Sequence, residues 1–259
     1  MEGFTVRPMS VDDAALIGER SSACTSALLG FAKHSAEDVA NYLRDPGFPP
    51  ETDGWVVLDR RGEFAGSATA AVNSDGSRVN LEVLSEVPEV AGWLLDRGLE
   101  RARQAGPGEV VVSVGVIQQD EFLAKIVADR GFTVGTSVHR MRITFDGPVE
   151  RPPVPPGAVV RRGAFDDTTR RAAHAVLEEA FSSQPGADPR PYDEWAASRE
   201  SRSTFDWSRL TTVELDGRSG TILHVDTSNP TPALRLYTSA GMHPDLTSTI
   251  WRRTVRTRG

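Results

Sequence analysis

An internal repeat limits the possible folds of this chain more than any other feature of its sequence. Residues 4–23, FTVRPMSVDDAALIGERSSA, are typical of a strand, a turn with paired aspartates and a helix. Residues 158–181 follow the same order, and Arg161 matches Arg7 at an offset of 154 residues. We therefore expect two copies of one strand-and-helix unit.

The second copy is shorter than the first. Gly217 matches Gly62 at an offset of 155 residues, but Gly241 matches Gly131 at an offset of only 110. The difference between these offsets means that the second copy lacks about 45 residues, in the region after Arg218.

In the first copy the corresponding interval predicts a strand over 63–72, a second strand over 78–86 and a helix over 88–104. Pro88 suits the first turn of a helix, where its missing N–H has no cost. Apolar residues at helical spacing line one face of this helix, namely Val90, Leu94, Leu95, Leu99 and Ala102. This order of elements predicts an α/β fold with a mixed sheet, present as two tandem domains.

A proline-rich stretch, GPVERPPVPPG, separates the two copies. Such a composition favours an extended connection, so we predict a first domain over 1–147, a linker over 148–157 and a second domain over 158–259. If the second domain has lost a strand, its strand at 210–215 would expose an edge, and a second copy of the chain could pair with it as a homodimer.

Composition narrows the class of partner. The net charge of −7 argues against nucleic acid, and the four arginines of WRRTVRTRG at 251–259 are expected to form a solvated tail. No apolar run is long enough to cross a membrane and the first residues do not resemble a secretory signal, so a cytoplasmic location without membrane contact is expected. Cys24 is the only cysteine, which excludes an intramolecular disulfide, and we expect it to be a buried thiol.

Residues 224–242, HVDTSNPTPALRLYTSAGM, together with the order of the elements, resemble the GCN5-related N-acetyltransferase (GNAT) family in its tandem two-domain actinobacterial form. The resemblance implies acetyl-CoA as the co-substrate. It also implies transfer of the acetyl group to a primary amine of a small molecule or a protein.

The same resemblance assigns roles to residues of the last strand, turn and helix. It implies that Tyr237 protonates the departing CoA thiolate, as a phenol can do. It further implies that Asn229 binds the pantetheine arm of the coenzyme, beside Leu223 and Val225 of the strand, with Tyr237 close to the same arm. Two alternatives stay open: Asn229 as a helix cap or turn residue, and Tyr237 as a core aromatic.

Amine acetylation also needs a base, and the family often uses a glutamate on the strand that includes Glu82 and Glu86. The alternative is a solvated strand face. His224 and Asp226 share a strand face, but a metal site would need a third ligand that the sequence does not offer, so no metal is predicted.

The resemblance fails at one motif. The family holds the coenzyme pyrophosphate with a loop of the form Arg/Gln-x-x-Gly-x-Gly/Ala, whereas residues 85–92 read SEVPEVAG, with Glu86 and Glu89 in place of basic and glycine residues. Carboxylates repel phosphates, so weak binding of acetyl-CoA to the first copy is expected. The alternative function is therefore an inactive pseudo-acetyltransferase that acts as a binding or structural module.

Overall fold

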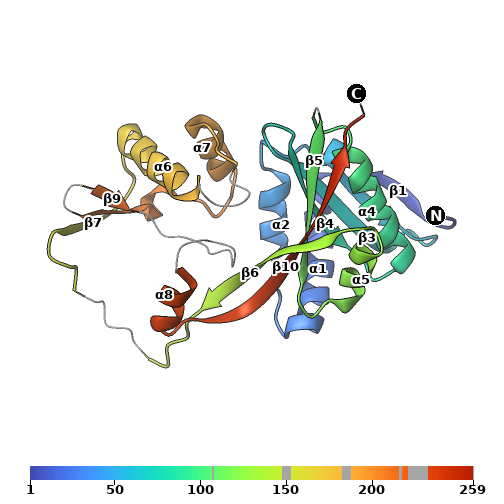
Figure 1. Ribbon diagram of the computed structural model, residues 1–259, viewed down its shortest axis with the longest axis horizontal. Helices are drawn as coiled ribbons and strands as arrows, with labels where there is room; N and C mark the ends of the chain where they lie inside the picture. Colours follow the sequence, from blue (N-terminus) through green and yellow to red (C-terminus); the bar gives the residue numbers. More distant parts are fainter. Residues whose placement is uncertain (107, 148–152, 183–187, 216–217, 221–232, 259) are drawn as a thin grey trace. The chain divides into compact units, whose positions relative to one another are not determined.

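The computed structural model describes residues 1–106, 108–147, 153–182, 188–215, 218–220 and 233–258, which form two compact units (Figure 1). The first unit comprises Met1–Val138, Ser201–Ser203 and Leu246–Gly259, and the second comprises His139–Glu200 and Thr204–Asp245. Each unit is described by itself.

A seven-stranded mixed sheet forms the first unit, in the order β1-β2-β3-β4-β5-β10-β6. Strands β4 and β5 are parallel, whereas β1–β2, β2–β3, β3–β4 and β5–β10 are antiparallel. The predicted α/β class is confirmed. The strands are β1 (Thr5–Pro8), β2 (Gly54–Leu58), β3 (Phe64–Val72), β4 (Arg78–Leu84), β5 (Glu109–Ile117), β6 (Thr133–Arg142) and β10 (His243–Arg256).

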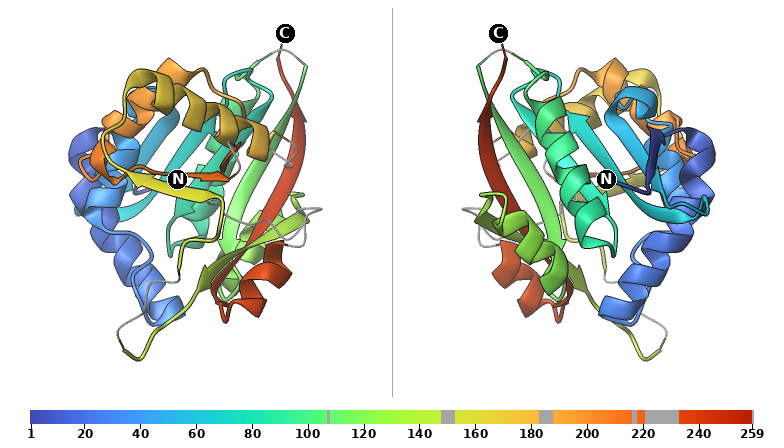
Figure 2. Two further views of the ribbon diagram at one scale, coloured as in Figure 1. Left: turned by 90° about the vertical axis from the view of Figure 1, so that its left-hand side faces the viewer. Right: turned by 90° about the vertical axis from the view of Figure 1, so that its right-hand side faces the viewer.

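Helices cover both faces of this sheet (Figure 2). Helices α4 (Pro88–Ala102) and α5 (Glu121–Ala128) pack on one face, and α1 (Ala14–Leu29) and α2 (Ala36–Leu43) pack on the other face near β2 and β3. Helix α4 begins at Pro88, as predicted, and its predicted apolar face is at most 3% exposed. The short α3 (Pro50–Asp53) leads into β2.

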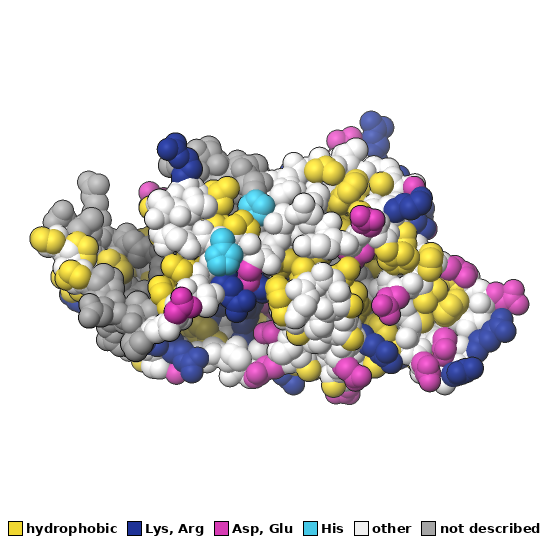
Figure 3. Space-filling model, turned by 90° about the horizontal axis from the view of Figure 1, so that it is seen from below, with side chains coloured by type: hydrophobic (Ala, Val, Ile, Leu, Met, Phe, Trp, Pro, Cys, Tyr) yellow, Lys and Arg dark blue, Asp and Glu magenta, His cyan; other side chains and the backbone are white. Residues whose placement is uncertain are grey.

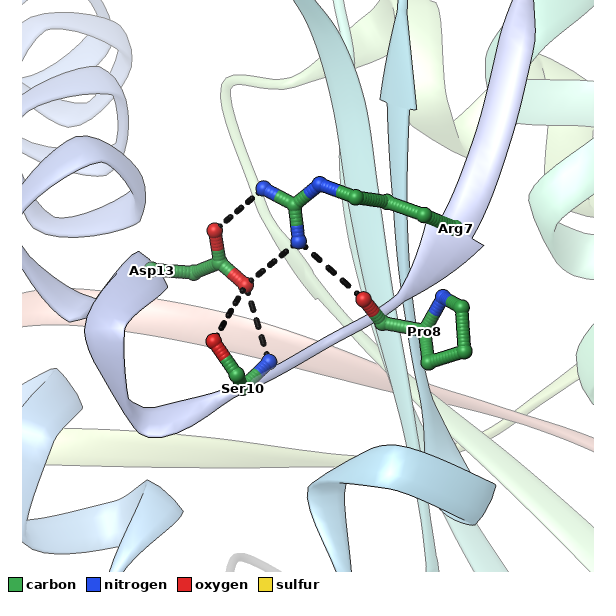
Figure 4. A network of polar contacts seen from close by, with 4 residues as sticks. All are labelled: Arg7, Pro8, Ser10 and Asp13. Atoms are coloured by element: carbon green, nitrogen blue, oxygen red, sulfur yellow. Dashed lines mark hydrogen bonds and ion pairs between the residues drawn. The ribbon is translucent and has the colours of Figure 1, made fainter.

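A buried carboxylate fixes the junction between β1 and α1 (Figure 4). Asp13 ends the short 3-10 helix η1 (Val11–Asp13) and accepts a hydrogen bond from Arg7 Nη1 at 2.8 Å and from the Ser10 amide at 2.8 Å. Arg7 Nη1 also donates to the Pro8 carbonyl at 3.1 Å. One side chain thus connects the first strand to the start of the first helix.

The second unit repeats the first part of this order. Its strands β7 (Ala158–Arg162), β8 (Thr211–Leu215) and β9 (Arg218–Gly220) form a three-stranded antiparallel sheet. Between β7 and β8 come α6 (Asp167–Phe181), α7 (Tyr192–Glu200) and η2 (Trp207–Arg209), as α1 and α2 come between β1 and β2, and α8 (Ala233–Ser239) follows β9. The repeat predicted from the sequence is confirmed.

The second copy is also short, as predicted. Residues 73–120 separate β3 from α5 in the first copy, whereas only residues 221–232 separate β9 from α8 in the second. The 7 residues of β4 and the 15 of α4 exceed the 12 residues of this interval. Strand β8 is nevertheless paired on both sides, with β7 and with β9, so the expected exposed edge does not lie on the strand at 210–215.

Aromatic side chains pack the helical layer of the second unit. The ring of Trp195 lies 5.1 Å from that of His174, 5.9 Å from that of Tyr192 and 6.0 Å from that of Trp207. The guanidinium of Arg170 stacks over Trp207 at 4.2 Å. This small unit therefore relies on ring packing and cation–π contacts for its core.

The end of the chain differs most from expectation, because residues 251–258 do not form the predicted solvated tail. In Figure 1, β10 runs between β5 and β6, and it pairs with β5 from Ser248↔Ile117 to Arg256↔Glu109. Val255 is 6% exposed and Trp251 packs against the same core, which explains why a strand with three arginines is held in the sheet. The predicted second domain, 158–259, includes this strand, whereas its contacts group residues 246–259 with the first unit.

None of the helices within the described residues combines the length and the apolarity that crossing a bilayer requires.

Candidate functional site

The two parallel strands at the centre of the first sheet separate partway along their length. Strands β4 and β5 pair from Arg78↔Val111 to Leu81↔Val114 and no further, although β4 continues to Leu84. Over the same stretch β4 still pairs with β3, and β5 still pairs with β10 as far as Ile117. Residues 82–84 and 115–117 therefore face each other without main-chain hydrogen bonds between the two strands. Their free N–H and C=O groups can bind an extended ligand.

The opening between β4 and β5 is accessible on one face of the sheet. Side chains alternate along β5, and the four valines at 110, 112, 114 and 116 face α4, with at most 2% of each exposed. On the opposite face Ser113 is half-buried and Gly115 is exposed. A Cβ built at Gly115 would meet only Ile250 Cδ1, at 3.6 Å, so the main chain is bare at this point.

Four polar side chains share this open face. By register, Asn80, Ser113 and Arg252 lie side by side on β4, β5 and β10, and Glu82 follows Asn80 on the same face of β4. Among the described residues, none of these four side chains has a hydrogen bond or an ion pair. The face therefore has free donors and acceptors in the middle of a sheet, where polar groups are normally paired.

Tyr42 of α2 stands beside Glu82. Its hydroxyl lies 3.4 Å from Thr69 Oγ1, and Thr69 is the cross-strand neighbour of Glu82 on β3. Burial raises the pKa of Tyr42 to about 12, and the charge of Glu82 adds to the increase. The phenol is therefore protonated at neutral pH. Sequence reasoning missed it because a tyrosine on an amphipathic helix carries no signal of its own.

Carboxyl groups surround the end of the opening at which α4 and α5 begin. Asp120 caps α5 by accepting a hydrogen bond from the Leu123 amide at 2.9 Å, and its burial raises its pKa. Burial also raises the pKa of the Cys24 thiol, and the charges of Asp120 and Glu86 raise it further. Cys24 is thus half-buried and held as a thiol, and the local potential is negative.

The junction between β4 and α4 is tight and contains no glycine-rich loop. Ser85 Oγ donates to the Ala65 carbonyl at 2.7 Å and accepts from the Val87 amide at 3.1 Å, and the helix begins at the next residue. Pro88 has no N–H to offer. At Gly92, inside α4, an added Cβ would clash with the guanidinium of Arg130, so this position is covered by an arginine.

The site residues predicted from the sequence fall in three groups. Glu82 lies at the opening, exposed on β4. Tyr237 lies on α8 in the second unit, and its counterpart in the first copy, Val127 of α5, is fully buried. Leu223, Val225, Asn229, His224 and Asp226 lie outside the described residues. Tyr42, Ser113 and Arg252 were not predicted.

Solved structures share this fold along the whole chain. A GCN5-related N-acetyltransferase from Sphaerobacter thermophilus is 20% identical and superposes with a TM-score of 0.77 over 99% of this chain and 97% of its own. A tandem GNAT protein from the clavulanic acid biosynthesis pathway is 14% identical, with a TM-score of 0.69 over 99% and 100% of the two chains. A putative acetyltransferase from Pyrococcus horikoshii is 11% identical, with a TM-score of 0.60 over 99% and 91%.

These neighbours establish the tandem GNAT fold that the sequence resemblance implied. No family model matches the chain, and no curated protein matches it in sequence.

Proposed function

We propose that this chain is a GNAT-type N-acetyltransferase, which transfers an acetyl group from acetyl-CoA to a primary amine of a small molecule or a protein. The observation that carries the proposal is the separation of β4 from β5 beside an exposed glutamate, in a chain with the tandem GNAT fold over 99% of its length. An extended thioester arm can lie along the free main-chain groups of the opening.

Glu82 is the proposed base. The attacking amine must lose its proton before its nitrogen can add to the thioester carbonyl, and a carboxylate within reach can accept that proton directly or through water. The carbon–sulfur bond then breaks and the departing thiolate takes up a proton. For a coenzyme bound to the second copy, we propose Tyr237 of α8 as the donor of that proton. Leu223, Val225 and Asn229 are proposed to contact the coenzyme.

The coenzyme is expected to bind weakly. Helix α4 leaves the N–H groups of Glu89 and Val90 without an intrahelical partner, which favours an anion, but the carboxylates of Glu86 and Glu89 oppose it. Each carboxylate near a phosphate costs about 1 kcal/mol, which corresponds to about fivefold in affinity.

Neutralising both carboxylates tests this account. In the full chain, Glu86→Gln with Glu89→Gln is expected to tighten acetyl-CoA binding by about 10-fold or more, as measured by calorimetry. The control is Glu2→Gln with Glu63→Gln, which changes the net charge equally at exposed positions elsewhere. Equal affinity in the two double variants would show that the pyrophosphate does not lie at the start of α4.

Turnover tests the function itself. Incubation of the full chain with acetyl-CoA and a panel of primary amines, followed by mass spectrometry, should reveal an acetylated amine, and Glu82→Gln should slow its formation by about 100-fold. If acetyl-CoA gives no transfer and no thermal stabilisation, in both the original chain and the neutralised variant, the result favours the inactive binding or structural module instead.

Charge and surface support a small-molecule or peptide partner. The net charge is −7, and acidic, basic and hydrophobic side chains are interspersed on the face seen in Figure 3, an arrangement that does not favour phosphate backbones. We further propose a cytoplasmic location with no membrane contact. We also propose a homodimer, which light scattering would detect.

A further inference from the structure

Among the residues that the structure describes, two charged side chains of opposite sign lie unpaired on the open face of the first sheet. Glu82 lies on β4, and Arg252 lies two strands away on β10, half-buried and without a side-chain partner among the described residues. Two strand spacings amount to about 10 Å, and Asn80 and Ser113 lie between the two charges on the same face. A molecule seated over exposed Gly115 would have a carboxylate at one end and a guanidinium at the other.

The Arg252 side chain occupies space that is free because Gly135 has no side chain. Its stem crosses Gly135 of β6, where an added Cβ would lie 2.9 Å from Arg252 Cδ and 3.1 Å from Nε. The guanidinium therefore lies on the β6 side of the face and does not reach across the sheet to Glu82. An arginine on an inner strand that is neither paired nor fully solvated can bind an anionic group that comes from elsewhere.

We propose, on the basis of the proposed function, that the acceptor is an amine that also has a carboxylate or another anionic group at its far end. Its amino group lies at Glu82, its anionic group lies at Arg252, and Asn80 and Ser113 bind the body between them. A plain alkylamine would leave the Arg252 charge unpaired. A plain carboxylate would leave Glu82 without a partner.

A matched set of small probes tests this inference in the full chain. The ω-amino acids β-alanine, 4-aminobutyrate, 5-aminovalerate and 6-aminohexanoate are compared with the alkylamines and the alkyl carboxylates of the same lengths. At equal millimolar concentration, at least one ω-amino acid is expected to raise the melting temperature more than both of its single-charge analogues, because only it pairs both residues.

Substitutions at Arg252 and Gly135 locate the effect. Arg252→Gln should reduce the shift with the ω-amino acid to that with the matched amine, and Arg252→Lys should keep part of it. Arg256→Gln, on the same strand with an 88% exposed side chain, is the control and should change nothing. Gly135→Ala should weaken the preference without removing the charge, since it displaces the Arg252 stem.

The possible results separate this inference from the proposed function. If no ω-amino acid exceeds its matched amine, or if the preference persists in Arg252→Gln, the inference is wrong, whether or not acetyl transfer occurs. If ω-amino acids bind with the expected preference but acetyl-CoA is never turned over, the binding site stands and the proposed function fails.

Discussion

At the scale of single residues, the junction held by Asp13 makes a pH-dependent contribution to stability. Hydrogen bonds from Arg7 lower the pKa of Asp13, and hydrogen bonds from the amide and hydroxyl of Ser10 lower it further. Because the folded pKa is below the unfolded value of about 3.9, this stabilisation is complete above that value and is lost as the pH falls through the folded pKa.

The substitution Asp13→Asn should therefore cost about 1–3 kcal/mol in the free energy of unfolding at pH 7. The same measurement, by urea titration, should show the cost shrinking as the pH is lowered from 4 to 3. Asp12→Asn, one residue earlier and exposed, is the control. An equal cost at both extremes of pH would mean that Asp13 acts through its shape and not through its charge.

Whether a site residue could be predicted depended on whether its neighbours lie close in sequence. Glu82 was predictable because the alternation of β4 and the family resemblance both indicate it. Tyr42 and Arg252 were not, because they share a face with Glu82 only through tertiary packing and through the register of β10 against β5. The residues that the resemblance assigns to the coenzyme, Leu223, Val225 and Asn229, remain predictions.

At the scale of elements, the local periodicity of the sequence predicted helices and strands correctly, but it did not predict which distant segments pair. Helix α4 was predicted from its apolar spacing and from Pro88, and the strands predicted over 63–72 and 78–86 correspond to β3 and β4. Strand β10 was missed because four arginines in WRRTVRTRG indicate solvation. No local pattern indicates that this segment pairs with a strand more than a hundred residues earlier.

Two adjacent residues of β10 provide a test of this pairing. Val255 is 6% exposed in the core of the first unit, and Thr254 is exposed on the opposite side of the strand. Val255→Asp should lower the free energy of unfolding by about 3 kcal/mol or more, because it buries an unpaired polar group, whereas Thr254→Asp should cost less than about 1 kcal/mol. Similar costs for the two variants in urea titrations would argue against β10 as an inner strand.

At the scale of the whole molecule, the tandem repeat did not by itself reveal how the copies are connected. The chain passes between its compact units at residues 138, 200, 203 and 245, and not once at the proline-rich stretch. A fragment of residues 1–147 would lack β10, and with it the strand between β5 and β6. Measurements of coenzyme binding should therefore use the full chain, because failure of the fragment would report lost folding.

Because β10 comes last in the sequence but lies inside the first sheet, the behaviour of a cleaved chain can be predicted. A protease site inserted among the exposed residues 153–157 would divide the chain into two pieces. The first piece would contain every strand of the first sheet except β10, which belongs to the second piece. Because β10 pairs with β5 along nine residue pairs and contributes Val255 to the core, the two pieces should stay together after cleavage.

Size-exclusion chromatography with light scattering should then give the mass of the intact chain in native buffer, and two separate pieces only in denaturant. The same cleavage in the Val255→Asp variant should release the pieces, because the variant weakens the packing of β10 and leaves the peptide bonds unchanged. If the nicked original chain separates in native buffer, β10 does not hold the second piece to the first sheet. The two domains would then be joined as the sequence alone suggested, by the proline-rich linker.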